Sequence, residues 1–396
     1  MTSSALMPNY NRADILFERG DGPWLYTADG ASYLDFTSGI AVNTLGHADP
    51  RMIEVLEEQG RRVWHISNIF RNPQAEALAQ KLVHISFADR VFFCNSGAEA
   101  VEASIKAVRR YFWARDEAVK NRIITFVGAF HGRTLGTIAA GGNPSYMEGF
   151  APNLDGFDHV PLGDLDALKA TIGPSTAGVL IEPIQGEGGV QPAPDGFLAA
   201  LRQLCDENGL LLMFDEVQCG IARTGRIFAC EWDGVTPDVM ALAKGLGGGF
   251  PIGACLLTED VAQHMSPGTH GSTFGGNPLA AAVGNAMVDI ITEDNFLPHV
   301  RRIAGYLSQK LGAMRDSYPD KIAQIRGRGL LTGIKFTDDV SNVDVVNAAR
   351  DVHLLIPPGG DNVVRLLPPL NVEMDIIDEA VVRLEQAVMS VCITTS

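Results

Sequence analysis

The chain has 396 residues, a formal net charge of −16, 46% hydrophobic residues and 20% charged residues. This composition is typical of a folded globular protein and excludes wholesale disorder. The excess of carboxylates repels phosphate backbones and anionic lipids. We therefore expect neither general nucleic-acid binding nor membrane-surface binding, although a locally basic site can still bind a small anion.

Sequence motifs of several other protein classes are missing. The first ten residues lack the cationic and apolar segments of a signal peptide, and no apolar run reaches 18 residues. We therefore expect no secretion signal and no membrane-spanning helix. The six cysteines form no C-x-x-C pair, and the histidines form no H-E-x-x-H motif. These patterns predict buried reduced thiols, no metal site and a cytoplasmic location.

The chain divides into three zones. Residues 1–50 contain short strand-like segments, residues 51–290 alternate helical segments with apolar strands, and residues 291–396 are richer in helix. We predict that residues 51–290 form a large domain. The N-terminal segment and residues 291–396 are expected to form a smaller α+β domain together.

The predicted strands are short apolar runs. In the middle zone these runs do not alternate with polar residues, which is typical of strands covered on both faces. Helical periodicity lies between them, as in the apolar face of Val101, Ile105, Val108 and Phe112. In chain order the strands are Trp24–Thr27, Ser32–Phe36, Val91–Phe93, Ile123–Val127, Val179–Ile181, Leu210–Phe214 and Val239–Ala243, and a last helix is predicted over Asp375–Ser390. The pattern predicts an α/β fold with a mainly parallel central sheet flanked by helices.

Ligands of such sheets bind beyond the carboxyl ends of the strands, so the residues that follow each strand are informative. Ser96, Gly97 and Ala98 follow the strand Val91–Phe93 and open a helix. Free backbone amides, a hydroxyl and a glycine at this place make an anion cradle. The alternative is a plain helix cap, because Ser96 with Glu99 three residues on matches a capping box.

The strand Ile123–Val127 is followed by Phe130, His131 and Arg133. Phe130 or His131 can stack on a flat ring, and the Arg133 guanidinium can bind a carboxylate with two hydrogen bonds. The alternatives are a core aromatic residue, a histidine satisfied by ordinary hydrogen bonds and a surface arginine.

Asp215 and Glu216 follow the strand Leu210–Phe214. A carboxylate at the end of an all-apolar strand is costly to bury without a partner, so Asp215 requires a cation, a metal or a protonated ring nitrogen. A helix cap or an ordinary salt bridge is the alternative. No nearby histidine or third carboxylate supports a metal pair.

Lys244 follows the strand Val239–Ala243 and precedes a loop with four glycines. A partly desolvated lysine amine is nucleophilic and can form a covalent bond with an aldehyde. The alternative is a solvated lysine. The loop matches neither a Walker motif nor G-x-G-x-x-G.

Together these strand-end residues predict one cofactor. A lysine for an aldehyde, an aspartate for a ring nitrogen, a phosphate cradle and an aromatic ring are what pyridoxal 5'-phosphate requires. Residues 51–290 are therefore the predicted cofactor-binding domain.

Longer motifs resemble those of the class III (ω-amino) aminotransferases, in order and along essentially the whole chain. They lie at residues 96–100, 130–133, 182–189, 214–218, 243–249, 271–278 and 365–369. The resemblance implies the PLP-transferase fold type I. Within the family, residues 39–47, 64–68 and 218–220 favour the branch that uses N-acetylornithine as amino donor.

The resemblance also implies a role for each matching position. Lys244 would hold the cofactor and shuttle the proton, and Asp215 would pair with the pyridine nitrogen. Phe130 would stack on the ring, and Gln218 would bind its hydroxyl. Thr273 would reach the cofactor of a neighbouring subunit, which implies a homodimer with shared active sites. The remaining expected cofactor-binding residues are Ser96, Gly97 and Ala98 at the phosphate, and Glu216 and Val217 beside Asp215.

Four positions are expected to bind substrate. Arg133 would bind the distal carboxylate of the ω-amino donor, and Arg365 would bind the α-carboxylate of 2-oxoglutarate. Glu187 would pair with Arg365 when no dicarboxylate is bound, and Ser272 would lie near the substrate. The expected reaction gives N-acetylglutamate 5-semialdehyde and glutamate, as in arginine biosynthesis. Alternative donors are succinylornithine, 4-aminobutyrate, ornithine and N-acyl-lysine analogues, and less expected functions are an aminomutase or a non-catalytic binding protein.

Overall fold

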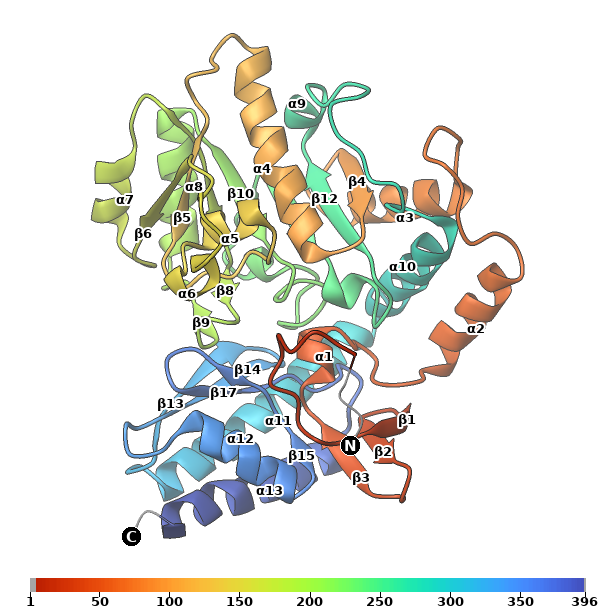
Figure 1. The fold of residues 1–396 in the computed structure, drawn as a ribbon, viewed down its shortest axis with the longest axis vertical. Coiled ribbons are helices and arrows are strands. Elements are labelled where there is room, and N and C mark those ends of the chain that lie inside the picture. The colour runs from red at the N-terminus through yellow and green to blue at the C-terminus, as the bar shows by residue number, and fades with distance from the viewer. Residues whose placement is uncertain (1–4, 395–396) are drawn as a thin grey trace.

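A seven-stranded sheet forms the centre of the upper part of the molecule (Figure 1). The structure is a computed structural model that describes residues 5–394. The strands β10, β11, β7, β5 and β6 pair in parallel, whereas β12 pairs antiparallel with both β11 and β4. Across the sheet the order is β4 (Arg90–Cys94), β12 (Gly253–Leu257), β11 (Val239–Leu242), β10 (Leu211–Asp215), β7 (Thr176–Ile181), β5 (Arg122–Phe126) and β6 (Phe157–Val160).

Helices cover both faces of this sheet because its strands are apolar on both sides. In β10, Leu211 and Met213 pack in a cluster with α4 (Gly97–Ala114), while Leu212 and Phe214 pack in a second cluster that includes α8 (Phe197–Asn208). The other helices of this part are α2 (Pro50–Gly60), α3 (Pro73–His84), α5 (Leu135–Gly141), α6 (Pro144–Met147), α7 (Leu165–Thr171), α9 (Glu259–Ala262) and α10 (Pro278–Ile291). The observed sheet and its helices confirm the predicted α/β fold.

The lower part of the molecule contains both ends of the described chain (Figure 1). One sheet has the order β13 (Ile322–Arg328), β14 (Leu331–Phe336), β17 (Val363–Leu366), β16 (Pro358–Gly359) and packs with α11 (Phe296–Ser317), α12 (Asn342–Asp351) and α13 (Met374–Thr394). A second sheet has the order β1 (Phe17–Asp21), β2 (Trp24–Thr27), β3 (Ser32–Asp35), β15 (Leu354–Leu355). Strand β3 therefore pairs with a strand some 300 residues later. The domain boundaries at residues 50 and 290 stay predictions.

The short remaining elements surround the junction between the two parts. They are α1 (Ser38–Ala41), the hairpin of β8 (Ile184–Gln185) and β9 (Gln191–Pro192), and the 3₁₀ turns η1 (Ala229–Trp232) and η2 (Lys244–Leu246). In α1, Ser38, Ile40 and Ala41 have positive φ angles of 43°, 65° and 60°, which is costly for residues with a Cβ.

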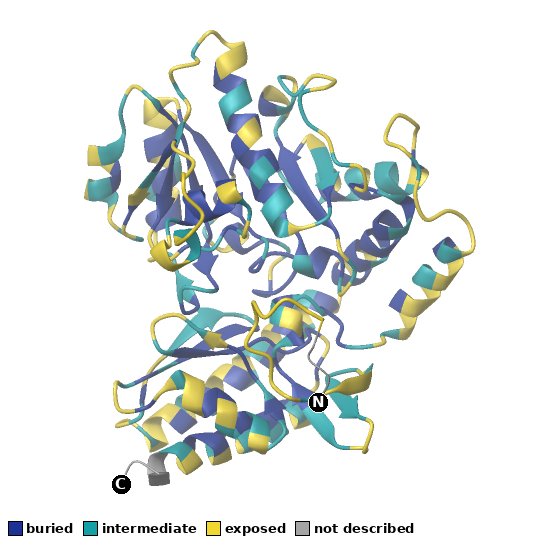
Figure 2. Ribbon diagram, in the orientation of Figure 1, coloured by how far each residue is buried: buried dark blue, intermediate teal, exposed yellow. Residues whose placement is uncertain are grey.

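The distribution of burial follows the predicted core (Figure 2). All seven predicted strands are present, within three residues at their ends, and the helix face of Val101, Ile105, Val108 and Phe112 is buried. Five cysteines are free and buried, as expected, while the side chain of Cys392 lies outside the described residues. Between residues 5 and 394, no helix is long and apolar enough to cross a membrane, and no cluster of side chains is suited to a metal ion.

Candidate active site

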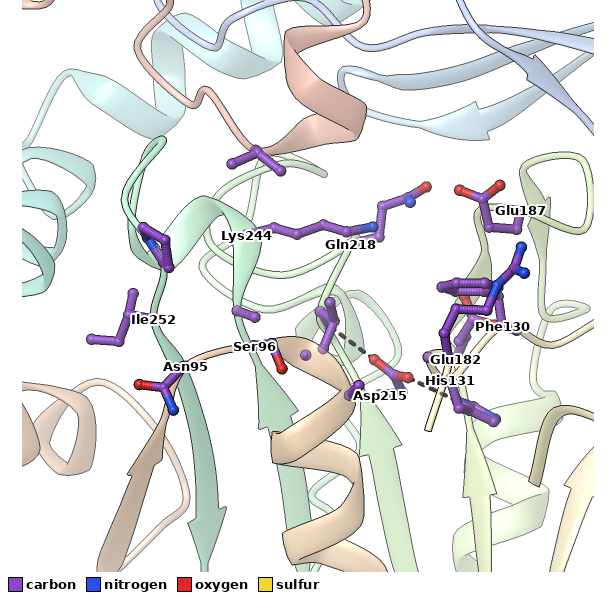
Figure 3. Close-up of a pocket in the computed structure, with 18 of the residues that line it drawn as sticks. Asn95, Ser96, Phe130, His131, Glu182, Glu187, Asp215, Gln218, Lys244 and Ile252 are labelled. Atoms are coloured by element: carbon purple, nitrogen blue, oxygen red, sulfur yellow. Dashed lines mark hydrogen bonds and ion pairs between the residues drawn. The ribbon is translucent and has the colours of Figure 1, made fainter. Parts of the chain in front are cut away.

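A pocket of about 430 Å³ lies at the carboxyl ends of the central strands, facing the lower part of the molecule (Figure 3). Most of its wall consists of residues that directly follow β4, β5, β7, β10 and β11. The lining residues that the sequence predicted are Ser96, Gly97, Ala98, Phe130, Arg133, Glu187, Asp215, Val217, Gln218 and Lys244. The fold therefore brings together side chains that are up to 148 positions apart in the chain.

The start of α4 forms one side of the pocket. Ser96 is the N-cap of the helix, and its Oγ accepts a hydrogen bond of 3.3 Å from the amide of Glu99. The Glu99 carboxylate accepts a 2.6 Å bond from the amide of Asn95, one residue before the position that a capping box uses. A Cβ at Gly97 would lie 2.6 Å from Val217, so only glycine lets the helix start approach the loop after β10. The helix N-terminus is thus presented as an anion cradle.

Asp215 has a buried histidine as its partner. Its Oδ2 lies 2.8 Å from Nδ1 of His131, and its Oδ1 accepts a 3.0 Å bond from the Val217 amide. Burial lowers the pKa of His131, but the hydrogen bond and the charge of Asp215 outweigh burial, so that the pKa is raised. The Asp215 side chain, at 4% exposure, thus has a partner for each of its two oxygens inside the protein.

Lys244 is the first residue of η2 and has a φ angle of 41°. A left-handed backbone at a residue with a Cβ is strained, and such strain is concentrated at functional sites. Burial lowers the pKa of the Lys244 amine; the Arg365 charge lowers it further, and the Glu187 charge opposes the change. These surroundings shift the equilibrium of the amine toward its neutral, nucleophilic form.

Gln218 places an unsatisfied polar atom at the pocket. Its Oε1 is buried and has no hydrogen-bond partner within residues 5–394. The side chain lies close against Gly186, where a Cβ would collide with it. A buried amide oxygen without a partner is uncommon and indicates that a ligand donor completes the site.

Glu187 and Arg365 form an ion pair with two hydrogen bonds, of 2.5 Å and 3.1 Å. The Arg365 side chain lies on β17 and is 3% exposed, whereas that of Glu187 is 28% exposed. Arg365 also donates to the carbonyl of Pro358, at 2.8 Å and 3.1 Å. The predicted pair is present, and it contributes a residue from the lower part of the molecule to the site.

Arg133 lies at the open side of the pocket. Its guanidinium carbon is 3.7 Å from the centre of the Tyr146 ring and 5.6 Å from that of Phe130. Arg133 has no carboxylate within ion-pair distance in the described part of the chain. The exposed guanidinium is thus free to accept a carboxylate from solution.

Four predicted site residues do not line this pocket. Arg365 adjoins it through its ion pair with Glu187. The Glu216 carboxylate accepts bonds from the amides of Ala229 and Cys230, at 2.6 Å and 2.8 Å, on the opposite side of the chain from Asp215. Successive residues at the end of an extended strand face opposite ways, which explains the separation. Ser272 and Thr273 lie on a loop around a second cavity, where the Ser272 Oγ accepts from Asn95 Nδ2 at 3.1 Å.

The lining residues that sequence reasoning missed include Val42 and Glu182, and it also missed the link between His131 and Asp215. Glu182 is 5% exposed, and burial followed by repulsion from Asp215 raises its pKa. A signal for Glu182 existed, since it directly follows the apolar strand β7, like the acids that were considered. Val42 carried no such signal, because it comes from the zone before residue 50.

These features fit pyridoxal phosphate. The amine of Lys244, the carboxylate of Asp215, the free oxygen of Gln218 and the cradle at Ser96 are the donors and acceptors that such a ring requires. The arrangement can hold an anionic aromatic aldehyde, move a proton at Lys244 and bind carboxylates at two arginines.

Comparisons with known proteins agree with this site. The sequence model of the class III aminotransferase family matches residues 6–388. The acetylornithine aminotransferase of Brucella melitensis is 54% identical over 98% of this chain and 96% of its own length, and acetylornithine aminotransferase 1 of Bradyrhizobium diazoefficiens is 56% identical over the same shares. The chain belongs to the class III aminotransferases, and its cofactor is pyridoxal phosphate.

Solved structures confirm the fold. The N-acetylornithine aminotransferase of Stenotrophomonas maltophilia is 36% identical with a TM-score of 0.85, and the two chains are covered to 97% and 98%. The ornithine aminotransferase of Toxoplasma gondii is 31% identical with a TM-score of 0.94, covering 98% of this chain and 94% of that one. Family, fold and cofactor are therefore as predicted, while the role of each residue stays a prediction.

Proposed function

We propose that this aminotransferase moves the terminal amino group of N-acetylornithine to 2-oxoglutarate, giving N-acetylglutamate 5-semialdehyde and glutamate, a step of arginine biosynthesis. The observation that carries the proposal is the ion pair between Arg365 and Glu187, a residue that lines the same pocket as Lys244 and Arg133. Relatives of 51–56% identity over almost the whole chain that bear the name acetylornithine aminotransferase support the choice of donor.

The residues that would hold the cofactor are those of the pocket floor. The amides at Gly97 and Ala98, with Ser96, would bind the phosphate, and Phe130 would pack on the ring. Gln218 would accept a hydrogen bond from the ring hydroxyl, which would satisfy its free oxygen. When bound, the cofactor supplies an electron sink for the carbon that loses its proton.

Lys244 and Asp215 would carry the chemistry. A lysine amine with a lowered pKa can bind an aldehyde and can take and return a proton at Nζ. Asp215, held in place by His131, would hold a proton on the ring nitrogen. No other described lysine lines the pocket, so the proton transfer depends on Lys244.

The two arginines would serve the two substrates in turn. Arg133 is exposed and would bind the carboxylate of the ω-amino donor. Arg365 is covered by Glu187 while that donor is bound, and it would become available to 2-oxoglutarate when Glu187 moves. An unpaired guanidinium in a closed pocket is costly, so a carboxylate that covers and leaves it suits a pocket with two differently shaped substrates.

The proposed assembly is a homodimer in the cytoplasm. Thr273 is exposed on the loop after Gly271, where it can reach a second copy of the chain, and Ser272 beside it would lie near the substrate. Five buried, free cysteines fit a reducing compartment. We further propose that residues 51–290 act as the cofactor-binding domain, with the two ends of the chain forming the small domain.

The likeness to ornithine aminotransferase, with a TM-score of 0.94, makes ornithine the second candidate donor. A panel of N-acetylornithine, N-succinylornithine, ornithine, 4-aminobutyrate and N-acetyl-lysine, each assayed for kcat/KM with 2-oxoglutarate, tests the proposal. N-acetylornithine should give the highest value. A higher value for another donor would refute the proposed donor, and turnover without any amino acceptor would point to an aminomutase.

A further inference from the structure

Glu182 connects the two loops that carry the substrate-binding charges. Its Oε1 accepts a 2.8 Å hydrogen bond from the amide of Phe130, and its Oε2 accepts a 3.3 Å bond from the amide of Gly186. Phe130 begins the segment that leads to Arg133, and Gly186 directly precedes Glu187. One buried carboxylate thus holds both segments at once.

Further contacts pack the two loops against each other. The Gln185 Nε2 donates to the carbonyl of Val127 at 3.0 Å, and a Cβ at Gly188 would lie 2.6 Å from the carbonyl oxygen of Gly128. Side chains therefore cannot be inserted between the loops without moving them apart. The position of Glu187 depends on the position of the Phe130 segment.

We propose that Glu182 is a positioning residue that holds the Glu187 loop in register with Arg365, and that it acts without touching the substrate. The inference rests on the proposed function of Glu187 as the group that covers Arg365. A connected path then runs from Asp215 through His131, Phe130, Glu182 and Gly186 to the ion pair at Arg365.

The carboxylate is essential to this role because it offers an acceptor on both sides. Glu182→Gln keeps the length and shape, but its amide can accept only one of the two backbone N–H groups and turns its own NH₂ toward the other. The bond to Phe130 is the shorter one, so we expect the amide oxygen to stay there and the Gly186 amide to be left without an acceptor. The substitution should therefore loosen the Glu187 loop while Phe130 keeps its place.

The test compares Glu182→Gln with wild type and with Glu187→Gln, all as holoenzymes. Hydrogen–deuterium exchange reports the loops, and the inhibition constant of norvaline against N-acetylornithine reports the access of an α-carboxylate to Arg365. We expect faster exchange over residues 184–190 but unchanged exchange over residues 122–127. An effect of the size of one ordinary hydrogen bond should tighten norvaline by about threefold to tenfold, and the KM for 2-oxoglutarate should fall in the same direction because both α-carboxylates bind Arg365.

Glu216→Gln is the matched control for stability. Glu216 is also buried and also accepts two backbone amides, but these belong to Ala229 and Cys230. A comparable loss of thermal stability in both variants, with faster exchange over residues 184–190 only in Glu182→Gln, supports the inference. Two results overturn the role of Glu182 and leave that of Glu187 standing. One is unchanged exchange over residues 184–190 in Glu182→Gln; the other is norvaline inhibition that is unchanged in Glu182→Gln but tighter in Glu187→Gln. Unchanged inhibition in both variants overturns the proposed function of Glu187 as well.

Discussion

Glu187→Gln removes the negative charge that covers Arg365 and leaves the size of the side chain almost unchanged. In the structure the pair has two hydrogen bonds, of 2.5 Å and 3.1 Å, around a guanidinium that is 3% exposed. A hydrogen bond between charged groups contributes about 1.5–3 kcal/mol, against about 0.5–1.5 kcal/mol for neutral groups. Loss of the charge should therefore weaken the cover by about 1.5 kcal/mol, or roughly tenfold in an equilibrium constant.

Single-turnover kinetics of the two half-reactions measure this effect. An α-carboxylate no longer has to displace an ion pair, so the dissociation constant of 2-oxoglutarate should fall by roughly tenfold. The preference for ω-amino over α-amino donors should fall by a similar factor. Glu187→Asp, which keeps the charge on a shorter side chain, is the control for shape. If the donor preference in Glu187→Gln equals that of the wild type, Glu187 does not cover Arg365 during the donor half-reaction.

Three further predictions concern other parts of the site. Lys244→Ala should lose turnover by several orders of magnitude while its circular dichroism stays native, because no neighbouring amine lines the pocket; substantial turnover would contradict its role. Arg133→Ala should slow the donor half-reaction, and Arg365→Ala the 2-oxoglutarate half-reaction, each by roughly 10- to 100-fold from the loss of a charge-assisted contact; equal losses in both halves would argue against two separate carboxylate sites. Burial raises the pKa of Glu216 to about 7, so the contribution of Glu216 to the stability of the fold is complete below its ordinary pKa of 4.5 and is lost as the pH rises through 7. The loss of unfolding free energy caused by Glu216→Gln, measured by urea unfolding, should therefore shrink by roughly 2–3 kcal/mol between pH 5 and pH 8. A loss that is the same at both pH values would contradict the raised pKa.

Much of the site could be predicted because the carboxyl end of a buried parallel strand is recognisable in the sequence as the place where an apolar run stops. Apolar runs of four or five residues are visible in the sequence, and a lysine or aspartate directly after such a run is conspicuous. Lys244, Asp215 and Ser96 were found in this way, and the structure brings all three to one pocket. The ion pair of Glu187 and Arg365 required the family resemblance, because 178 positions separate the two residues.

The rest depended on geometry that local patterns do not contain. Strand β12 was not among the predicted strands, and its direction could not have been predicted either, since a buried antiparallel strand has the same apolar run as a parallel one. Glu216 was grouped with Asp215, although alternation along the strand sends it to the other face. The positive φ angles of residues 38–41, which precede Val42 in the pocket wall, arise from tertiary packing that overrides the local preferences of Ile40 and Ala41.

The pairing of β3 with β15 has a consequence for the biosynthesis of the enzyme. Leu34 pairs with Leu354, so the N-terminal strand cannot complete its sheet until the ribosome has made nearly the whole chain. The cradle at Ser96, Asp215 and Lys244 all precede residue 245, whereas Arg365 emerges late. A nascent chain can therefore contain Ser96, Asp215 and Lys244 long before it has Arg365, the arginine proposed to bind the second substrate. A chain that terminates shortly before residue 365 lacks this arginine but keeps Lys244.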